Sequence, residues 1–472
     1  MLIKNVIFFI LLVQIMVACY PVYKSDEKPP NIIIILTDDQ QFDAVGHNAN
    51  PIIQTPALDN FASKSMQFYN ANVAFALCSP SRAAILTGRY GSANGVLELG
   101  SKLNSGEVSI GQYLKDAGYI TGFTGKWHID QQPQQLGFDF HSYFYSNGTY
   151  YGRKTMDMGK TIHPENHCDE YAAKRAIDFL RENSQKENPM FLMFCTQTPH
   201  MDHRHTWPAK QATMEKYKVE EMPVPKNHKD NLAGKPEFLK TVRNRTQALK
   251  YGYPDSTAIQ THTRDYYAVI SEMDDFISGV VEEIERLNLS EDTYIFFLSD
   301  NGWMLGDHGF TSKVLPYRPS AQIPFWVKGP GIKKNTQQAL VSNIDLAPTI
   351  MELAGLEVPD NMHGKSLLPI LKGESEKVRE TFVYEGLGNY GGAKPNLTVI
   401  NENFRYITTY QDNSLQEVIF EELYHQQNDL LEMENLIDHQ EYDDLKMQLK
   451  NALEKHKTEI LNGHKTSEHG HN

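Results

Sequence analysis

The chain has 472 residues, of which 40% are hydrophobic and 22% charged, and its formal net charge is −14 at pH 7. This length is sufficient for one large domain with its own core and a smaller appended domain. The acidic excess would repel a phosphate backbone, so we expect no nucleic-acid partner. With four cysteines in the whole chain, we also expect no disulfide framework.

Residues 1–18 have the features of an export signal. Lys4 provides a basic start, and the apolar run VIFFILLVQIMVA that follows is too short for a typical membrane span. Residues 16–19 read MVAC and resemble a bacterial lipobox, so we expect cleavage and lipidation at Cys19, with residues 19–27 as a linker; a plain signal peptide is the alternative. The protein is therefore expected to be exported, either in the periplasm or anchored to the outer membrane of a Gram-negative bacterium, with Cys19 as its one membrane contact.

Two apolar segments of strand length end in oxygen-bearing side chains. Residues 31–39 read NIIIILTDD, and residues 293–302 read TYIFFLSDNG. Such runs are typical of buried parallel strands, which deliver ligands at their carboxyl ends. The candidate metal ligands are Asp38, Asp39, Asp300 and Asn301. Oxygen ligands favour Ca²⁺, with Mg²⁺ second, over zinc, although each pair taken singly is also ordinary turn chemistry.

Residues 78–89, CSPSRAAILTGR, place a cysteine before a helix expected to start near residue 81. The pattern C-x-P-x-R followed by T-G-R resembles the formylglycine signature of the type I sulfatases, in which a maturation enzyme oxidises the cysteine to 3-oxoalanine. This resemblance implies that Cys78 is the nucleophile and a further oxygen ligand of the metal, and that Arg82 holds it in place. A buried structural cysteine is the alternative.

The resemblance also implies the chemistry. A hydrated aldehyde carries two hydroxyl groups on one carbon, and one of them can attack the sulfur of a sulfate ester. Loss of the proton of the other hydroxyl then expels sulfate and restores the aldehyde. The expected activity is hydrolysis of a sulfate ester, and the expected maturation partner is a formylglycine-generating or anaerobic sulfatase-maturating enzyme.

Cations and imidazoles follow other apolar segments. TGKWH places Lys126 and His128 after a short strand at residues 119–123, QTPH places His200 after residues 190–195, and GDHGFTSK contains His308 and Lys313. By resemblance, Lys126, His200 and Lys313 hold the sulfate and leaving-group oxygens, and His128 takes the proton that triggers collapse of the diol. Fixed positive charge is expected to make the largest contribution to catalysis.

Two loops are candidates for substrate recognition. HMDHRHTW, in the insertion at residues 200–263, contains imidazoles, a guanidinium and an indole suited to carboxylate binding and sugar stacking, and the Tyr-rich segment 143–153 forms an expected opposite wall. The candidate substrate-binding residues are His203, Arg204, His205, Trp207, Asn147 and His308. They predict a sulfated carbohydrate substrate. Uronate-containing algal polysaccharides such as ulvan, or glycosaminoglycans, fit this pattern, and carrageenan-type galactans remain open.

Apolar strands alternate with helical segments at residues 109–117, 169–181 and 265–289, which predicts an α/β fold with a large, mostly parallel or mixed sheet between helices. By resemblance this is the alkaline-phosphatase-like fold, and we place the catalytic domain at residues 28–377. Residues 378–462 predict a smaller α+β domain, with strands at residues 381–385, 398–400 and 405–409 and a closing helix. The His-rich tail, residues 463–472, is expected to be disordered.

The chain departs from the family pattern at residues 314–324, VLPYRPSAQIP, where Arg318 and Pro319 stand at positions that are often acidic. This departure puts a substrate-facing salt bridge in doubt. Two alternative functions stay open. One is a phosphodiester or phosphonate monoester hydrolase of the same superfamily that uses the same nucleophile, and the other is a non-catalytic glycan-binding lipoprotein.

Overall fold

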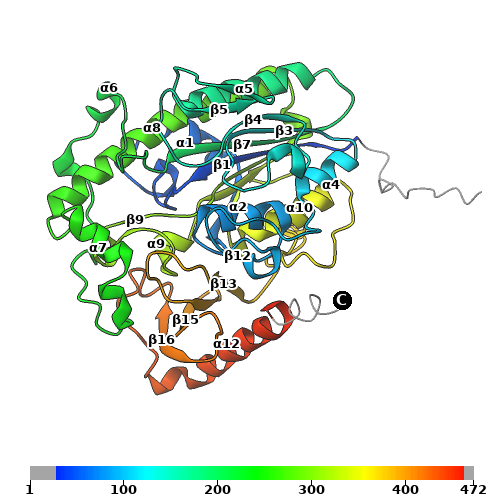
Figure 1. Ribbon diagram of the computed structural model, residues 1–472. Coiled ribbons are helices and arrows are strands. Elements are labelled where there is room, and N and C mark those ends of the chain that lie inside the picture. The colour runs from blue at the N-terminus through cyan, green and yellow to red at the C-terminus, as the bar shows by residue number, and fades with distance from the viewer. Residues whose placement is uncertain (1–27, 462–472) are drawn as a thin grey trace, which may run out of the picture.

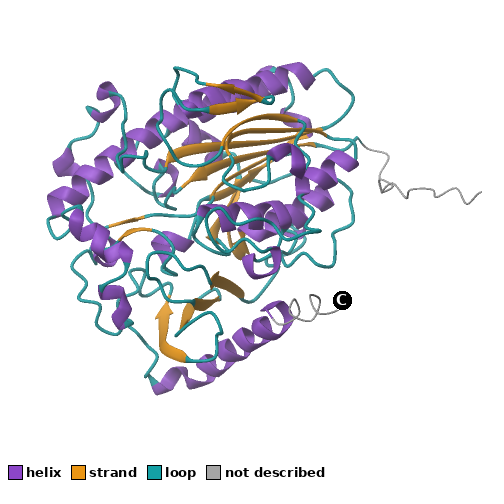
Figure 2. Ribbon diagram, viewed as in Figure 1, coloured by secondary structure: helices purple, strands orange, loops and turns teal. Residues whose placement is uncertain are grey.

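A computed structural model describes residues 28–461. Its main body is a ten-stranded mixed sheet in the order β12-β2-β11-β8-β1-β7-β3-β4-β5-β6 (Figures 1 and 2). The strands are β1 Asn31–Asp38, β2 Met66–Asn72, β3 Ile120–Lys126, β4 Phe140–Phe144, β5 Thr155–Asp157, β6 Lys160–Ile162, β7 Met190–Pro199, β8 Thr293–Ser299, β11 Phe325–Lys328 and β12 Asn335–Ser342.

The centre of this sheet is parallel, because β8, β1, β7, β3 and β4 pair in one direction. Alternate residues of β1 enter different cores: Ile32 and Ile34 pack on one face, and Ile33 and Ile35 pack on the other. A parallel strand that is buried on both faces requires a continuous apolar run, which is what the β1 and β8 sequences provide. The carboxyl ends of β1 and β8 therefore meet at one edge.

Helices cover both faces of the sheet, as Figure 1 shows. One layer contains α1 (Pro56–Ser63), α5 (Cys168–Asn183) and α8 (Ser256–Arg286), and the other contains α2 (Cys78–Thr87), α4 (Ile110–Asp116) and α10 (Leu346–Leu353). The remaining α-helices of this region are α3 Gly91–Asn94, α6 Gln211–Met214, α7 Arg243–Lys250, α9 Arg318–Ala321 and α11 Leu368–Leu371. The predicted α/β fold class is confirmed.

The helices predicted at residues 109–117, 169–181 and 265–289 are present as α4, α5 and α8, and the helix expected near residue 81 is α2, each with different bounds. The α4 helix begins after Ser109, whose hydroxyl accepts a hydrogen bond from the Gln112 amide as an N-cap. The α8 helix begins at Ser256, well before the predicted start at residue 265, because Asp255 caps it and buried Ile259 anchors its polar first turns. The α2 helix begins at Cys78 itself rather than near residue 81.

A four-stranded antiparallel sheet forms the smaller C-terminal region at the bottom of Figure 1, and α12 (Asp443–His456) packs on it. Its strands are β13 Phe382–Gly386, β14 Asn396–Ile400, β15 Phe404–Tyr410 and β16 Val418–His425. The sequence reasoning missed β16, whose first residues are exposed and whose middle carries two glutamates. A short hairpin, β9 (Met304–Leu305) with β10 (Thr311–Ser312), lies outside both sheets.

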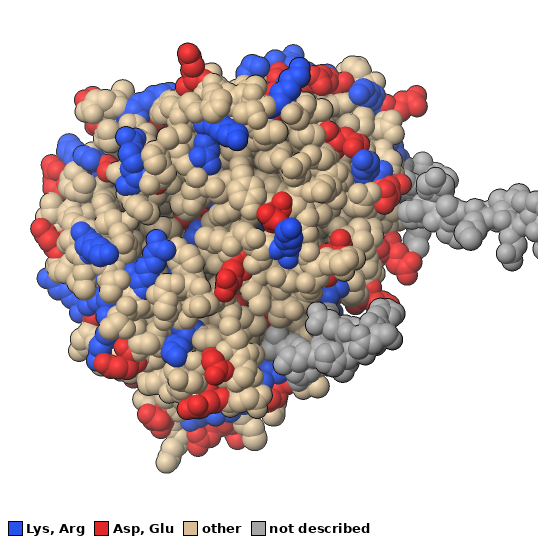
Figure 3. Space-filling view, in the orientation of Figure 1, with Lys and Arg blue, Asp and Glu red and all other residues tan. Residues whose placement is uncertain are grey.

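Among the residues that the structure describes, no helix is both long and apolar enough to cross a membrane. The predicted signal segment, the lipidation site at Cys19 and the polar tail lie outside the described residues. On the face drawn in Figure 3, basic and acidic side chains are interspersed. Because the whole chain is acidic, a binding site for an anion must hold its positive potential locally.

Candidate active site

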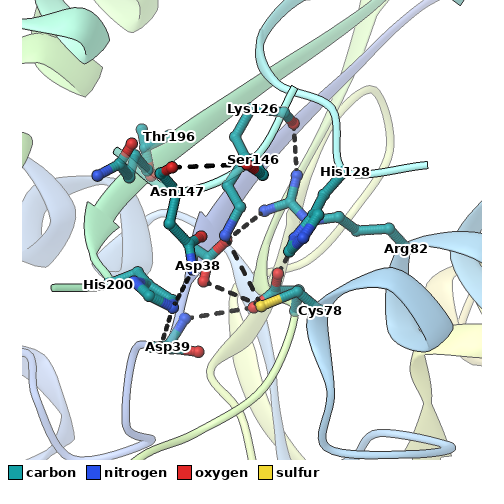
Figure 4. Close-up of polar contacts among 12 residues, drawn as sticks. Asp38, Asp39, Cys78, Arg82, Lys126, His128, Ser146, Asn147, Thr196 and His200 are labelled. Carbon is teal, nitrogen blue, oxygen red and sulfur yellow. Dashed lines mark hydrogen bonds and ion pairs between the residues drawn. The ribbon is translucent and has the colours of Figure 1, made fainter. Parts of the chain in front are cut away.

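The site lies where β1 and β8 end beside the first turn of α2 (Figure 4). The two strands pair in parallel with Thr37 opposite Ser299, and the Asp300 amide donates to the Thr37 carbonyl at 2.9 Å. Asp38 and Asp39 therefore come level with Asp300. The first turn of α2 adds the side chain of Cys78.

The ligand atoms of Asp38, Asp39, Cys78 and Asp300 all lie within 4.8 Å of one another, and all four residues are buried. Asp39 Oδ2 and Asn301 Oδ1 are buried without a hydrogen-bond partner among the described residues. Buried oxygens without partners are costly, and a divalent cation would satisfy both. The predicted oxygen ligands thus fit Ca²⁺ or Mg²⁺.

Basic side chains surround this acidic cluster. Arg82 donates from Nε to Asp300 at 2.9 Å and from Nη2 to Asp38 at 3.0 Å. Lys126 forms an ion pair with Asp38, and Lys313 forms one with Asp39. Burial raises the pKa of Asp38, but Lys126, Lys313 and Arg82 outweigh it and hold that pKa well below its usual value.

At Asp39 and Asp300, burial outweighs the neighbouring positive charges and raises the pKa. Burial raises the pKa of Asp39 to about 7 against the opposing charge of Lys313, with Asp38 adding to the rise. Burial and the charge of Asp38 also raise the pKa of Asp300. Since a metal ligand must be ionised, a cation bound here would have to displace protons from this cluster.

Cys78 points into the middle of these charges. Its Sγ lies 2.7 Å from Lys313 Nζ, 3.7 Å from Lys126 Nζ and 3.4 Å from Asp38 Oδ1. Burial, with the charge of Asp38, raises the pKa of the thiol in spite of the two lysines. The unmodified thiol is therefore protonated and a poor nucleophile.

Two neutral imidazoles flank the nucleophile. Nδ1 of His200 lies 2.7 Å from the Met201 carbonyl, which fixes it as the N–H donor and leaves Nε2 to accept from the Asn147 amide at 2.8 Å. Nδ1 of His128 has no hydrogen-bond partner among the described residues. Burial, then the charge of Lys126, holds the pKa of both rings well below the usual value. A neutral His128 can accept a proton.

The structure brings together the predicted catalytic residues and Asn147, and it buries two of the predicted substrate-binding residues, Trp207 and His308. His203 and His205 are exposed, and Arg204 is paired with Asp202 at 3.0 Å. Trp207 is 3% exposed, donates from Nε1 to the Pro199 carbonyl and packs against Tyr266. It offers no face for the predicted sugar stacking, because the insertion folds back on α8.

His308 is likewise buried, and its Nε2 has no hydrogen-bond partner among the described residues. It is fully buried, and its Nδ1 lies 2.6 Å from Asp230 Oδ2. The departure at Arg318 places its guanidinium next to Gln322 and 3.2 Å from the Tyr69 hydroxyl.

Sequence reasoning missed residues that position the site from a distance. Trp303, directly after the Asp300 strand, places its ring centroid 5.8 Å from Lys313 Nζ and 6.0 Å from the His200 ring. Asp169 was identified only as a helix start, yet its carboxylate accepts from the Gln197 and Thr198 amides at 2.7 and 2.9 Å, just before His200.

Tyr384 of β13 is a third residue that sequence reasoning missed. Its buried hydroxyl accepts from the Ala76 amide at 3.3 Å and donates to the Val314 carbonyl at 2.5 Å. It thus joins the loop before Cys78 to the loop that carries Lys313. No sequence pattern predicts this contact, because it depends on docking of the C-terminal sheet.

Comparison with known proteins decides the family. Residues 30–356 match the family described as Sulfatase, and residues 306–459 match the family described as N-sulphoglucosamine sulphohydrolase, C-terminal. The chain belongs to the sulfatase family. This sulfatase is accordingly a hydrolase of sulfate esters, as predicted.

Two relatives indicate the range of this family. The N-acetylglucosamine-6-O-sulfatase of Bacteroides thetaiotaomicron is 27% identical over 93% of this chain and 88% of its own length. The ulvan-active sulfatase of Formosa agariphila is 25% identical over 93% of this chain and 83% of its own length.

Solved structures agree in fold. A protein in complex with its substrate D-glucosamine-2-N,6-O-disulfate superposes with a TM-score of 0.82 at 28% identity, covering 92% of this sulfatase and 99% of that chain. A phosphonate monoester hydrolase from Silicibacter pomeroyi has a TM-score of 0.73 at 20% identity, covering 91% and 96% of the two chains. The second likeness shows the fold alone.

Proposed function

We propose that this sulfatase removes sulfate from a sulfated carbohydrate of acidic character, with residue 78 in the 3-oxoalanine form and Ca²⁺ in the carboxylate cluster. The observation that carries the proposal is the position of Cys78, which lies between Lys126 and Lys313 and beside the oxygens of Asp38. An anion held at residue 78 would meet positive charge from two sides.

Each residue has a task that follows from its contacts. The cation, when bound, would offset negative charge on the sulfate oxygens. Lys126 and Lys313 add fixed positive charge at the same point, which matters most in a buried site. His200, oriented by Asn147, faces the leaving oxygen, and the neutral His128 accepts the proton from residue 78.

We propose two candidate classes of substrate. The B. thetaiotaomicron relative and the substrate complex carry names that specify sulfated glucosamine, whereas the F. agariphila relative is described as ulvan-active. We therefore place sulfated amino sugars of glycosaminoglycans first and uronate-containing ulvan oligosaccharides second. Both are acidic sugars that carry a sulfate ester.

Released sulfate, measured by ion chromatography, tests this proposal. The panel contains glucosamine 6-O-sulfate, its N-sulfated form, ulvan oligosaccharides, carrageenan oligosaccharides, an aryl sulfate and an aryl phosphate diester. Cys78→Ala is the control. Faster turnover of the phosphate diester would favour the phosphonate or phosphodiester hydrolase, and glycan binding without sulfate release would favour the glycan-binding lipoprotein.

We also propose that the protein is exported and anchored by a lipid on Cys19, because residues 16–19 resemble a lipobox. Labelling of cells with a radioactive fatty acid tests the anchor, with Cys19→Ala as the control. Unlabelled wild-type protein released in soluble form from the periplasm would contradict it and favour a plain signal peptide.

A further inference from the structure

A cavity of about 490 Å³ opens beside the catalytic residues. Its lining includes Trp127, Asp130, Tyr145, Asn147, Arg153 and Lys154. Two contacts connect it to the site: the Asn147 amide reaches His200 at 2.8 Å, and the His128 amide donates to the Tyr145 carbonyl at 2.6 Å. The volume is within the range of small-ligand pockets.

The cavity holds two cations without acidic partners. Arg153 is partly buried and Lys154 is exposed, and neither forms an ion pair with a carboxylate among the described residues. The Arg153 guanidinium contacts the Ser146 carbonyl and lies 5.3 Å from the Phe144 ring centroid, while its Nε has no partner. A partly buried charge without a counter-ion is unfavourable, so an anionic ligand would be stabilised there.

The one acid in this lining is Asp130, which lies 3.3 Å from Nζ of the largely exposed Lys102 and, after burial, contributes to the raised pKa of Tyr145. Tyr145 is 43% exposed and presents an aromatic ring at the cavity mouth. Aromatic rings of this kind combine apolar contact area with a polar hydroxyl, which suits a sugar. The cavity therefore joins a space large enough for a sugar to two cations that form no ion pair among the described residues.

We propose that this cavity binds a second acidic substituent of the substrate, a sulfate or a carboxylate, through Arg153 and Lys154, with the sugar ring against Tyr145. The proposal rests on the proposed function and specifies its substrate. The fork of donors on Arg153 can bind either anion in a bidentate way, which Lys154 cannot do. An ester with this second acid should be preferred over its neutral counterpart.

Matched substrate pairs test the proposal. One pair is glucosamine 6-O-sulfate that carries an N-sulfate or, as its neutral counterpart, an N-acetyl group, and the other is a sulfated disaccharide with and without a uronate carboxylate. The variants are Arg153→Gln and Lys154→Gln, with Lys160→Gln on exposed β6 as the control. Loss of a charge-assisted hydrogen bond should lower kcat/KM for the preferred acidic substrate by roughly 10-fold or more, mainly through KM, and leave its neutral counterpart within about 2-fold.

The substrate pair for which the variants lower kcat/KM only on the acidic member identifies the bound acid as sulfate or carboxylate. Equal losses on acidic and neutral substrates would show that Arg153 only holds its loop, and would overturn the proposal, as would no loss at all. Binding of the same sugars to full-length Cys78→Ala, with and without Arg153→Gln, gives a second measurement that needs no turnover. A charge preference in binding without sulfate release would defeat the proposed function and keep this cavity as an acid-binding site.

Discussion

At the scale of single residues, Cys78 is a poor nucleophile as it is encoded. Its buried thiol has a raised pKa and lies against the oxygens that would hold a metal. Activity should therefore track the fraction of residue 78 converted to 3-oxoalanine, and Cys78→Ala should abolish turnover. Peptide mass spectrometry alongside kinetics measures both quantities. Full activity from protein with unmodified Cys78 would contradict the assignment.

Substitution of His128 and substitution of the lysines should impair different steps of the reaction. His128→Ala should release about one equivalent of desulfated product and then stop, with the mass of the sulfuryl group retained on residue 78, because the proton acceptor is missing. Lys126→Ala should instead slow the first transfer, since the charge that it offsets develops there. Rapid-quench product counting with intact-protein mass analysis separates the two outcomes. Loss of turnover in His128→Ala without a burst would assign the proton to another residue.

The oxygen cluster predicts dependence on a divalent cation. A chelator should inactivate the enzyme and Ca²⁺ should restore it, with Mg²⁺ as the second choice. Asp300→Ala should resist rescue at ordinary Ca²⁺ concentrations, because it removes a ligand and a partner of Arg82. Asp292→Ala, an exposed acid before the same strand, is the control. Undiminished activity in metal-free protein would exclude this role.

The residues of the site that could be predicted are those that follow apolar strands, because strand ends in a parallel sheet converge. Asp38, Asp300 and His200 are of this kind. Trp207 was predicted to contact substrate because its loop is rich in basic and aromatic residues, and His308 because it precedes Lys313 in the segment GDHGFTSK. Composition does not show which side of a loop packs, and tertiary contacts bury both side chains.

At the scale of elements, the loop that carries Lys313 is held in an unfavourable backbone conformation. Ser312 and Val314 have φ values of 73° and 83°, and Val314 is β-branched. Such residues cost of order 1–3 kcal/mol each and persist where surrounding contacts enforce them. Here the Val314 amide donates to the Ala76 carbonyl, and the Tyr384 hydroxyl binds both loops.

Tyr384→Phe should therefore lower kcat by roughly 10-fold and leave KM within about 2-fold, since it leaves two buried backbone groups unpaired and loosens Lys313 against residue 78. Conversion of Cys78, measured by mass spectrometry, should be unchanged. Tyr410→Phe is a matched control, because this tyrosine is equally buried in the same small sheet and its hydroxyl has no hydrogen bond among the described residues. Wild-type kcat in Tyr384→Phe would show that the Val314–Ala76 contact suffices.

Which helices and strands could be predicted depends on whether their own sequence or their neighbours stabilise them. The buried strands β1, β7 and β8 are marked by their own apolar runs, whereas β16 reads VIFEELYH and depends on its pairing with β15. The first turns of α8 are polar and are held by Asp255 and by packing of Ile259. Elements stabilised mainly by their neighbours carry a weak signal in the sequence.

At the scale of the whole molecule, buried charges join the C-terminal sheet to the catalytic region. Arg405 of β15 donates to the Pro316 carbonyl at 2.7 Å and to Asn72 at 3.1 Å. Lys235, from the insertion after His200, donates to the Tyr424 hydroxyl at 2.6 Å and to the Glu432 carbonyl at 2.8 Å. The C-terminal sheet therefore contacts the loop that carries Lys313 through Arg405 and the Pro316 carbonyl.

Glu432 closes this network, since its carboxylate lies 3.0 Å from Arg405 Nε and accepts from the Arg318 amide at 2.9 Å. Removing one partner of a buried pair leaves the other charge uncompensated, so Glu432→Ala should reduce the free energy of unfolding by about 3–5 kcal/mol. Denaturant unfolding measures this loss, with the exposed Glu434→Ala as the control, expected within about 0.5 kcal/mol of the wild type. An equally small loss in Glu432→Ala would mean that water reaches Arg405 and that the two regions are joined by their apolar contacts instead.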